Sequence, residues 1–207
     1  QLNDDQRQWV DDTFQTSVFP VLTPLAVDPA HPFPFVSNLS LNVAAVVVDP
    51  ETGQRQFARV KVPQKNLPRF IAIPSNLSGQ EHKPVHTAIA LEQVIAFNLK
   101  ELFPGMTIEG HYFFRVTRDA DLELRDLEAD DLMLALEQGL RKRRMGGEVV
   151  RLEVPNEMPQ DVVEMLMTGL SVEEEDLYVI DGPLGLDDLL SLTAVSYTHL
   201  RAHETHL

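Results

Sequence analysis

The chain contains 207 residues, of which 43% are hydrophobic, and this is enough for one globular domain with a sizeable core. Its 17 basic and 32 acidic residues give a formal net charge of −15, which repels polyanions at long range and argues against nucleic-acid binding. The sequence has no cysteine, which excludes disulfides and thiol chemistry and fits a cytoplasmic protein, and it has no apolar run of roughly 18 residues that would predict a membrane span.

A short helix is predicted over residues 4–17, because Trp9, Val10 and Phe14 recur at helical spacing. The sequence does not begin with Met, and its first residues lack the pattern of a signal peptide. We therefore expect a fragment of a longer protein, in which residues 1–17 connect to a preceding helical domain.

The next segment, residues 18–42, combines apolar residues with prolines. Each proline fixes φ, removes a backbone donor and pushes the residue before it away from helical geometry. The apolar content argues against a disordered linker, which would be polar. We predict an extended, buried and rigid segment without a helix. Its prolines are Pro20, Pro24, Pro29, Pro32 and Pro34.

The remaining elements follow from hydrophobic periodicity and from turn residues. Strands are predicted at 39–48, 56–62, 69–73, 107–117, 148–154 and 177–180, with a hairpin turn at 49–53. Helices are predicted at 91–102, 126–144, 159–170 and 186–192, and an exposed loop at 74–84. Because strands and helices do not alternate strictly, we predict a single α+β domain, a mixed β-sheet flanked by helices.

Several sequence blocks resemble one family in the same order along the chain. FPVLTPLAVDPAHPFPFVSNLSLN (19–42) resembles the opening of the middle, or head, domain of bacterial polyphosphate kinase. Four further blocks continue the resemblance: LEQVIAFNLKELFPGM (91–106), HYFFRVTRDADLEL (111–124), EADDLMLALEQGLRKRRMGGEVVRLEV (128–154) and DLYVIDGPLGLDDLL (176–190). Together they cover about residues 7–192, and their collinear order makes the resemblance specific.

The resemblance implies a parent enzyme that reversibly transfers the terminal phosphate of ATP to inorganic polyphosphate, through a phosphohistidine and with Mg²⁺. It also implies that the head domain supports homo-oligomer formation and frames the active-site tunnel, while the catalytic histidine, ATP and Mg²⁺ belong to other domains. We therefore assign no catalytic, cofactor or metal residue here and expect the fragment alone to be inactive. The alternative is a free-standing protein-interaction module with no enzymatic parent.

Two arginines in the FRVTRDAD block are candidates for phosphate or interface contacts. An arginine fork can bind phosphate through two parallel hydrogen bonds. Arg115 and Arg118 are three residues apart, however, so a strand directs them to opposite faces. Asp119 and Asp121 are near enough in sequence to pair with either arginine. We therefore favour a structural ion pair over phosphate binding for both.

The only dense basic cluster ends the helix predicted at 126–144. It can hold phosphate or an acidic partner, but cations also stabilise the negative end of a helix dipole, and we favour this capping role. The cluster consists of Arg141, Lys142, Arg143 and Arg144.

The other polar candidates are interpreted as structural. His31 and His111 stand in apolar surroundings and are expected to pack, and Asn38 and Asn42 are expected to bind neighbouring backbone groups. DGPLGL (181–186) lacks the lysine of a phosphate loop and predicts a turn.

The last residues, 195–207, differ from the rest of the chain. They contain His199, His203 and His206, match nothing in the kinase family and resemble translated adaptor sequence. We expect this tail to be non-native and assign it no metal site and no function.

Overall fold

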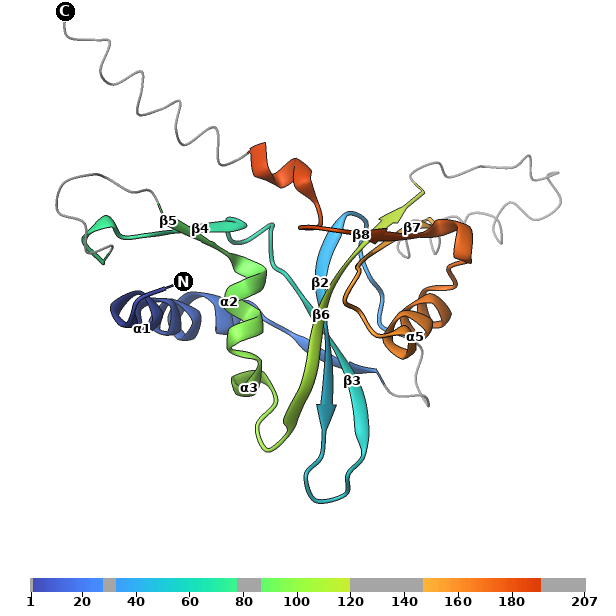
Figure 1. Ribbon diagram of the computed structural model, residues 1–207, viewed down its shortest axis with the longest axis horizontal. Coiled ribbons are helices and arrows are strands. Elements are labelled where there is room, and N and C mark those ends of the chain that lie inside the picture. The colour runs from blue at the N-terminus through green and yellow to red at the C-terminus, as the bar shows by residue number, and fades with distance from the viewer. Residues whose placement is uncertain (1, 28–32, 78–86, 120–146, 191–207) are drawn as a thin grey trace, which may run out of the picture.

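The computed structural model describes residues 2–27, 33–77, 87–119 and 147–190, which Figure 1 shows in colour. Several predictions lie outside these residues: the helix at 126–144 with its basic cluster Arg141–Arg144, the tail at 195–207, His31 and Asp121. In the part of the chain that the structure describes, no helix is long and apolar enough to cross a membrane.

A six-stranded sheet with the order β1-β3-β2-β6-β7-β8 forms the centre of the fold. Its strands are β1 (Pro24–Val27), β2 (Ser40–Val48), β3 (Arg55–Lys61), β6 (Thr107–Arg118), β7 (Val149–Pro155) and β8 (Leu177–Ile180). Neighbours are antiparallel except β7 and β8, which are parallel, so the sheet is mixed. A separate antiparallel pair consists of β4 (Phe70–Ile73) and β5 (Thr87–Ala90).

Helices cover both faces of the large sheet (Figure 1). They are α1 (Asp4–Thr13), α2 (Leu91–Phe97), α3 (Leu99–Leu102) and α5 (Gln160–Leu170). A π-helical turn at Phe14–Val18 extends α1, and Asn3 and Gln6 close a reciprocal capping box at its start. The prediction of a single α+β domain with a mixed sheet flanked by helices is therefore confirmed.

The sheet separates two hydrophobic cores, and β2 contributes to both. Val43 and Val47 pack with α1 and α2 in the first core, while Ala44 and Val46 pack with α5 in the second. Because successive side chains of a strand point to opposite faces, a strand buried on both faces is apolar throughout. This explains the continuous apolar run of β2.

The proline-rich segment differs from its prediction. Phe19–Val21 forms one 3₁₀ turn, and the side chains of Phe19, Val21 and Leu25 are exposed. Proline is tolerated in a first helical turn because its missing N–H has no partner there. The next residues, Pro24–Val27, form edge strand β1, where proline is also tolerated. The prediction of a buried segment without any helix was therefore wrong here.

Gly169 of α5 provides the contact surface for the ring of Phe33. A Cβ atom at Gly169 would lie 2.2 Å from Cδ2 of Phe33, which is closer than any real contact. Phe33 packs against the second core. The absence of a side chain at Gly169 therefore allows the segment from Phe33 onward to lie against the helix.

We predict that Gly169→Ala destabilises the domain by up to about 2 kcal/mol in urea unfolding. Alanine improves helix propensity by about 1 kcal/mol, but overpacking of this kind costs about 1–3 kcal/mol. The double variant Gly169→Ala/Phe33→Leu replaces the ring by a smaller side chain and should regain most of the lost free energy of unfolding. A single variant that is more stable than the parent chain would contradict the packing role of Gly169.

Candidate functional site

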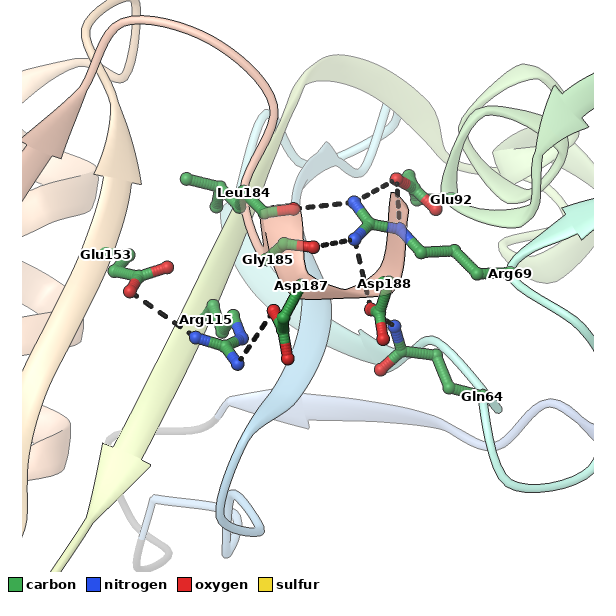
Figure 2. A network of polar contacts seen from close by, with 9 residues as sticks. All are labelled: Gln64, Arg69, Glu92, Arg115, Glu153, Leu184, Gly185, Asp187 and Asp188. Carbon is green, nitrogen blue, oxygen red and sulfur yellow. Dashed lines mark hydrogen bonds and ion pairs between the residues drawn. The ribbon is translucent and has the colours of Figure 1, made fainter. Parts of the chain in front are cut away.

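Arg69 lies just before β4 and inserts its guanidinium between α2 and the C-terminal segment (Figure 2). Only 8% of the residue is exposed. Its Nε and Nη2 donate to Oε1 of Glu92 at 3.1 and 2.7 Å. Nη2 and Nη1 also donate to the carbonyl oxygens of Leu184 and Gly185, at 2.6 and 2.5 Å. Nη1 further pairs with Oδ2 of Asp188 at 3.0 Å. Arg69 therefore joins three segments that are distant in sequence.

The pair of Arg69 and Glu92 is charged although it is buried. Glu92 is 6% exposed and lies in the first turn of α2, where the helix dipole favours a carboxylate. Burial works against the charged guanidinium, but the hydrogen bonds and charges of Glu92 and Asp188 outweigh it and raise the pKa of Arg69 above its ordinary value. Gln64 supports Asp188 by donating to its Oδ2 at 2.7 Å.

Arg115 of β6 lies on the same face of the sheet and is also held by carboxylates (Figure 2). Its Nη1 and Nη2 approach Oε1 of Glu153 and Oδ1 of Asp187, each at 3.4 Å. Arg151 donates from Nε to the same Glu153 oxygen at 2.8 Å and stacks on the ring of Tyr178 at 4.0 Å. The two carboxylate partners of Arg115 come from β7 and from the turn after β8, and neither is close to Arg115 in sequence.

The residues of Figure 2, together with Arg151, define what we call the acidic-face network. Its arginines bind carboxylates of the same chain. An anion would have to displace these internal partners, so the arrangement favours a structural role. The charged members are Arg69, Arg115, Arg151, Glu92, Glu153, Asp187 and Asp188.

Arg118 lies near the end of β6 and has different surroundings. Its Nε donates to the carbonyl of Val36 at 2.6 Å, and its Nη1 donates to the carbonyl of Gly147 at 2.8 Å. The guanidinium also lies over the ring of Phe35, 4.8 Å from its centroid. Burial lowers the pKa of Arg118 below its ordinary value. Among the described residues, the hydrogen-bond partners of Arg118 are therefore neutral.

Two cations of β3 approach the same short segment. Arg59 donates from Nη1 to the carbonyl of Phe35 at 2.9 Å, and Lys61 donates from Nζ to Oγ of Ser37 at 2.5 Å. Burial lowers the pKa of Arg59, and burial together with the positive charges of Lys65 and Arg59 lowers the pKa of Lys61. We call Arg59, Lys61 and Arg118 the cationic cluster. Sequence analysis did not identify its two β3 members.

Pairing register places the β3 members on the sheet face that α5 covers. Arg59 lies opposite Ala44 on β2, and Lys61 lies opposite Asn42. Ala44 belongs to the core beside α5, whereas Leu41, opposite Arg115, belongs to the other core. Arg59 and Lys61 therefore lie on the face opposite the acidic-face network.

Polar side chains fix the backbone that the cationic cluster contacts. Asn38 accepts the backbone N–H of Arg118 at 2.8 Å, and Asn42 donates to the carbonyl of Ser40 at 2.9 Å. Ser40 donates from Oγ to the carbonyl of Ser37 at 2.6 Å. The prediction that both asparagines bind neighbouring backbone groups is confirmed. The segment that presents acceptors to the cluster is thus held in one conformation.

The remaining predicted residues lie apart from these networks. His111 packs edge-on against Phe113, with ring centroids 6.0 Å apart. DGPLGL forms the predicted turn, with positive φ at Gly182 and Gly185. Among the described residues, no group of three or more His, Cys, Asp or Glu side chains is arranged to hold a metal ion.

Comparison with known proteins identifies the family. The model of the polyphosphate kinase middle domain matches residues 5–192. A polyphosphate kinase from Parasynechococcus marenigrum is 81% identical over 97% of this chain, and one from Prochlorococcus marinus is 73% identical over the same share. In both, the match covers 28% of the relative.

A solved structure has a similar fold. The crystal structure of polyphosphate kinase from Porphyromonas gingivalis superimposes with a TM-score of 0.71 at 22% sequence identity, over 91% of this chain and 25% of that chain. The present chain thus spans about 28% of the length of the curated relatives named above. The resemblance found in the sequence blocks is confirmed, and the chain belongs to the polyphosphate kinase family, of which it contains the middle domain.

Proposed function

We propose that the complete protein containing this domain reversibly transfers the terminal phosphate of ATP to inorganic polyphosphate. The single observation that carries this proposal is the match of the family model to residues 5–192. The identity of 81% to a protein named polyphosphate kinase supports it. A free-standing interaction module with no enzymatic parent is not favoured, because the relatives at this identity are kinases over three times as long.

Within that protein, this domain acts as a scaffold. It supports homo-oligomer formation and frames the path of the polyphosphate, while ATP, Mg²⁺ and the phosphorylated histidine occupy other domains. The internal pairing of the acidic-face network supports a structural role for that face. Residues 1–17 connect to the preceding domain, the tail at 195–207 has no function, and the protein is cytoplasmic.

The candidate contacts with phosphate or with a second subunit are the residues identified in the sequence. Arg115 has two carboxylate partners and serves the scaffold, whereas Arg118 donates its hydrogen bonds to neutral carbonyl oxygens. Arg141, Lys142, Arg143 and Arg144 are interface candidates in the complete kinase.

We predict that the isolated chain makes no polyphosphate from ATP and Mg²⁺, whereas a chimera does. The chimera replaces the matching 201 residues of the Parasynechococcus kinase by this sequence. It should retain polymer synthesis within about tenfold of the natural kinase, which corresponds to about 1.4 kcal/mol in activation free energy. Synthesis is measured as incorporation of radioactive phosphate from labelled ATP.

The unmodified Parasynechococcus kinase is the positive control, and the same kinase lacking its middle domain is the negative control. Polymer growth by the isolated chain would contradict the scaffold role. A folded chimera with no more activity than the negative control would contradict the proposed function of this sequence.

A further inference from the structure

We propose that the cationic cluster of Arg59, Lys61 and Arg118 is a binding site for phosphate groups, and that its ligand is a polyphosphate chain. The phosphate chemistry follows from the cluster itself, whereas the choice of polyphosphate rests on the proposed function. The site lies where β3 and the end of β6 meet the segment Phe35–Ser37.

The cluster concentrates positive charge without a matching negative charge. Among the described residues, no carboxylate lies within ion-pair distance of these three cations. Their hydrogen bonds go to carbonyl, hydroxyl and amide oxygens instead. Because the chain has a net charge of −15, such a cluster is not explained by its overall composition. Bound anions would supply the missing counter-charge.

Arg59 has unused hydrogen-bonding capacity. The residue is 7% exposed, and its Nε is buried without any hydrogen-bond partner. Leaving a buried donor of a charged group unpaired costs free energy, because the group has lost its water. Its Nη1 donates to the carbonyl of Phe35 at 2.9 Å and to the Oδ1 atom of Asn42 at 3.5 Å. Arg59 is thus held in place by two neutral oxygens, and its Nε has no hydrogen-bond partner.

The other two cations add donors of different geometry. Lys61 carries three N–H groups, and the structure gives it one partner, Ser37. Arg118 is oriented by stacking on Phe35 and by its bonds to Val36 and Gly147. Two guanidinium groups and one ammonium group supply positive charge and several N–H donors, which suits a tetrahedral oxyanion such as phosphate.

The surroundings allow access to an extended anion. Phe35 is 46% exposed, and Lys61 and Arg118 are only partly buried. Lys65 is exposed and lies close enough for its charge to act on Lys61. A ligand with several linked phosphates can therefore contact the cluster and Lys65 together, which a single phosphate cannot do as well.

The test measures binding of orthophosphate, tripolyphosphate and long-chain polyphosphate to the isolated 207-residue chain by isothermal titration calorimetry. We expect affinity to increase with the number of linked phosphates. Lys61→Gln and Arg118→Gln should each weaken tripolyphosphate binding by on the order of tenfold, because each removes a charged hydrogen bond. Arg55→Gln is the matched control, since Arg55 is a β3 cation paired with Glu109 and Asp161. It should leave the affinity within about twofold, as exposed paired charges contribute little.

Folding of each variant is checked by its urea midpoint, and Arg118→Lys, which keeps the charge, should bind better than Arg118→Gln. No measurable tripolyphosphate binding to the unmodified chain would overturn the site. An equal loss in Arg55→Gln would also overturn it. Equal affinity for orthophosphate and long chains would overturn the choice of polyphosphate and assign the site to free phosphate.

The chimera separates this inference from the proposed function. Polymer synthesis by the chimera, with no phosphate binding by the isolated chain, would overturn the inference and leave the function intact. Tripolyphosphate binding that is weakened in Lys61→Gln, together with an inactive folded chimera, would uphold the site and contradict the function.

Discussion

Replacing Arg69 by alanine should lower the free energy of unfolding by about 3–5 kcal/mol, because it leaves the buried carboxylate of Glu92 without its counter-charge. The same change removes the donors to the carbonyl groups of Leu184 and Gly185. The measurement is urea unfolding at neutral pH, followed by circular dichroism. A loss below about 1 kcal/mol would show that the buried pair does not hold the C-terminal segment.

Two further variants define the origin of that loss. Arg55→Ala breaks a pair at the surface, where ion pairs contribute about 0–1 kcal/mol, and serves as the matched control. The double variant Arg69→Met/Glu92→Leu removes both charges and should be more stable than Arg69→Ala alone. If the double variant is less stable than the single one, an unpaired carboxylate is not the cause.

Phe114→Ala should destabilise the domain by about 3–5 kcal/mol, because it opens a cavity in the second core. Phe114 has no exposed surface and lies in the central strand β6. Phe97→Ala makes the same chemical change at a residue that is 73% exposed, and we expect it to alter stability by less than about 0.5 kcal/mol. Similar urea midpoints for the two variants would contradict the second core as described.

Local patterns predicted most of the fold. The β2–β3 hairpin was predicted from its turn, where Oδ1 of Asp49 accepts the N–H of Glu51 at 2.8 Å and Gly53 adopts a φ of 70°. Strands β1 and β5 were missed. Each has only four residues, and β1 begins with Pro24, so neither has a long alternating pattern.

The polar networks were harder to predict than the strands. Arg115 lies opposite Leu41 of the first core and Arg118 contacts Val36 of the second, which agrees with the predicted opposite faces. The partners of Arg115 lie 38 and 72 residues away, however, and no local pattern indicates them. A signal did exist for Arg59 and Lys61. In ARVKV they alternate with buried valines, so both cations share one face of β3.

Because the sheet separates the acidic-face network from Arg59 and Lys61, the cations on its two faces have different partners. One side places four carboxylates around three arginines, and the other places Arg59 and Lys61 against neutral oxygens. Arginines already paired with carboxylates offer little to an incoming anion, whereas cations bound to neutral oxygens keep their charge uncompensated. Under the phosphate site proposed above, a polyanion contacts this domain on the face of Arg59 and Lys61.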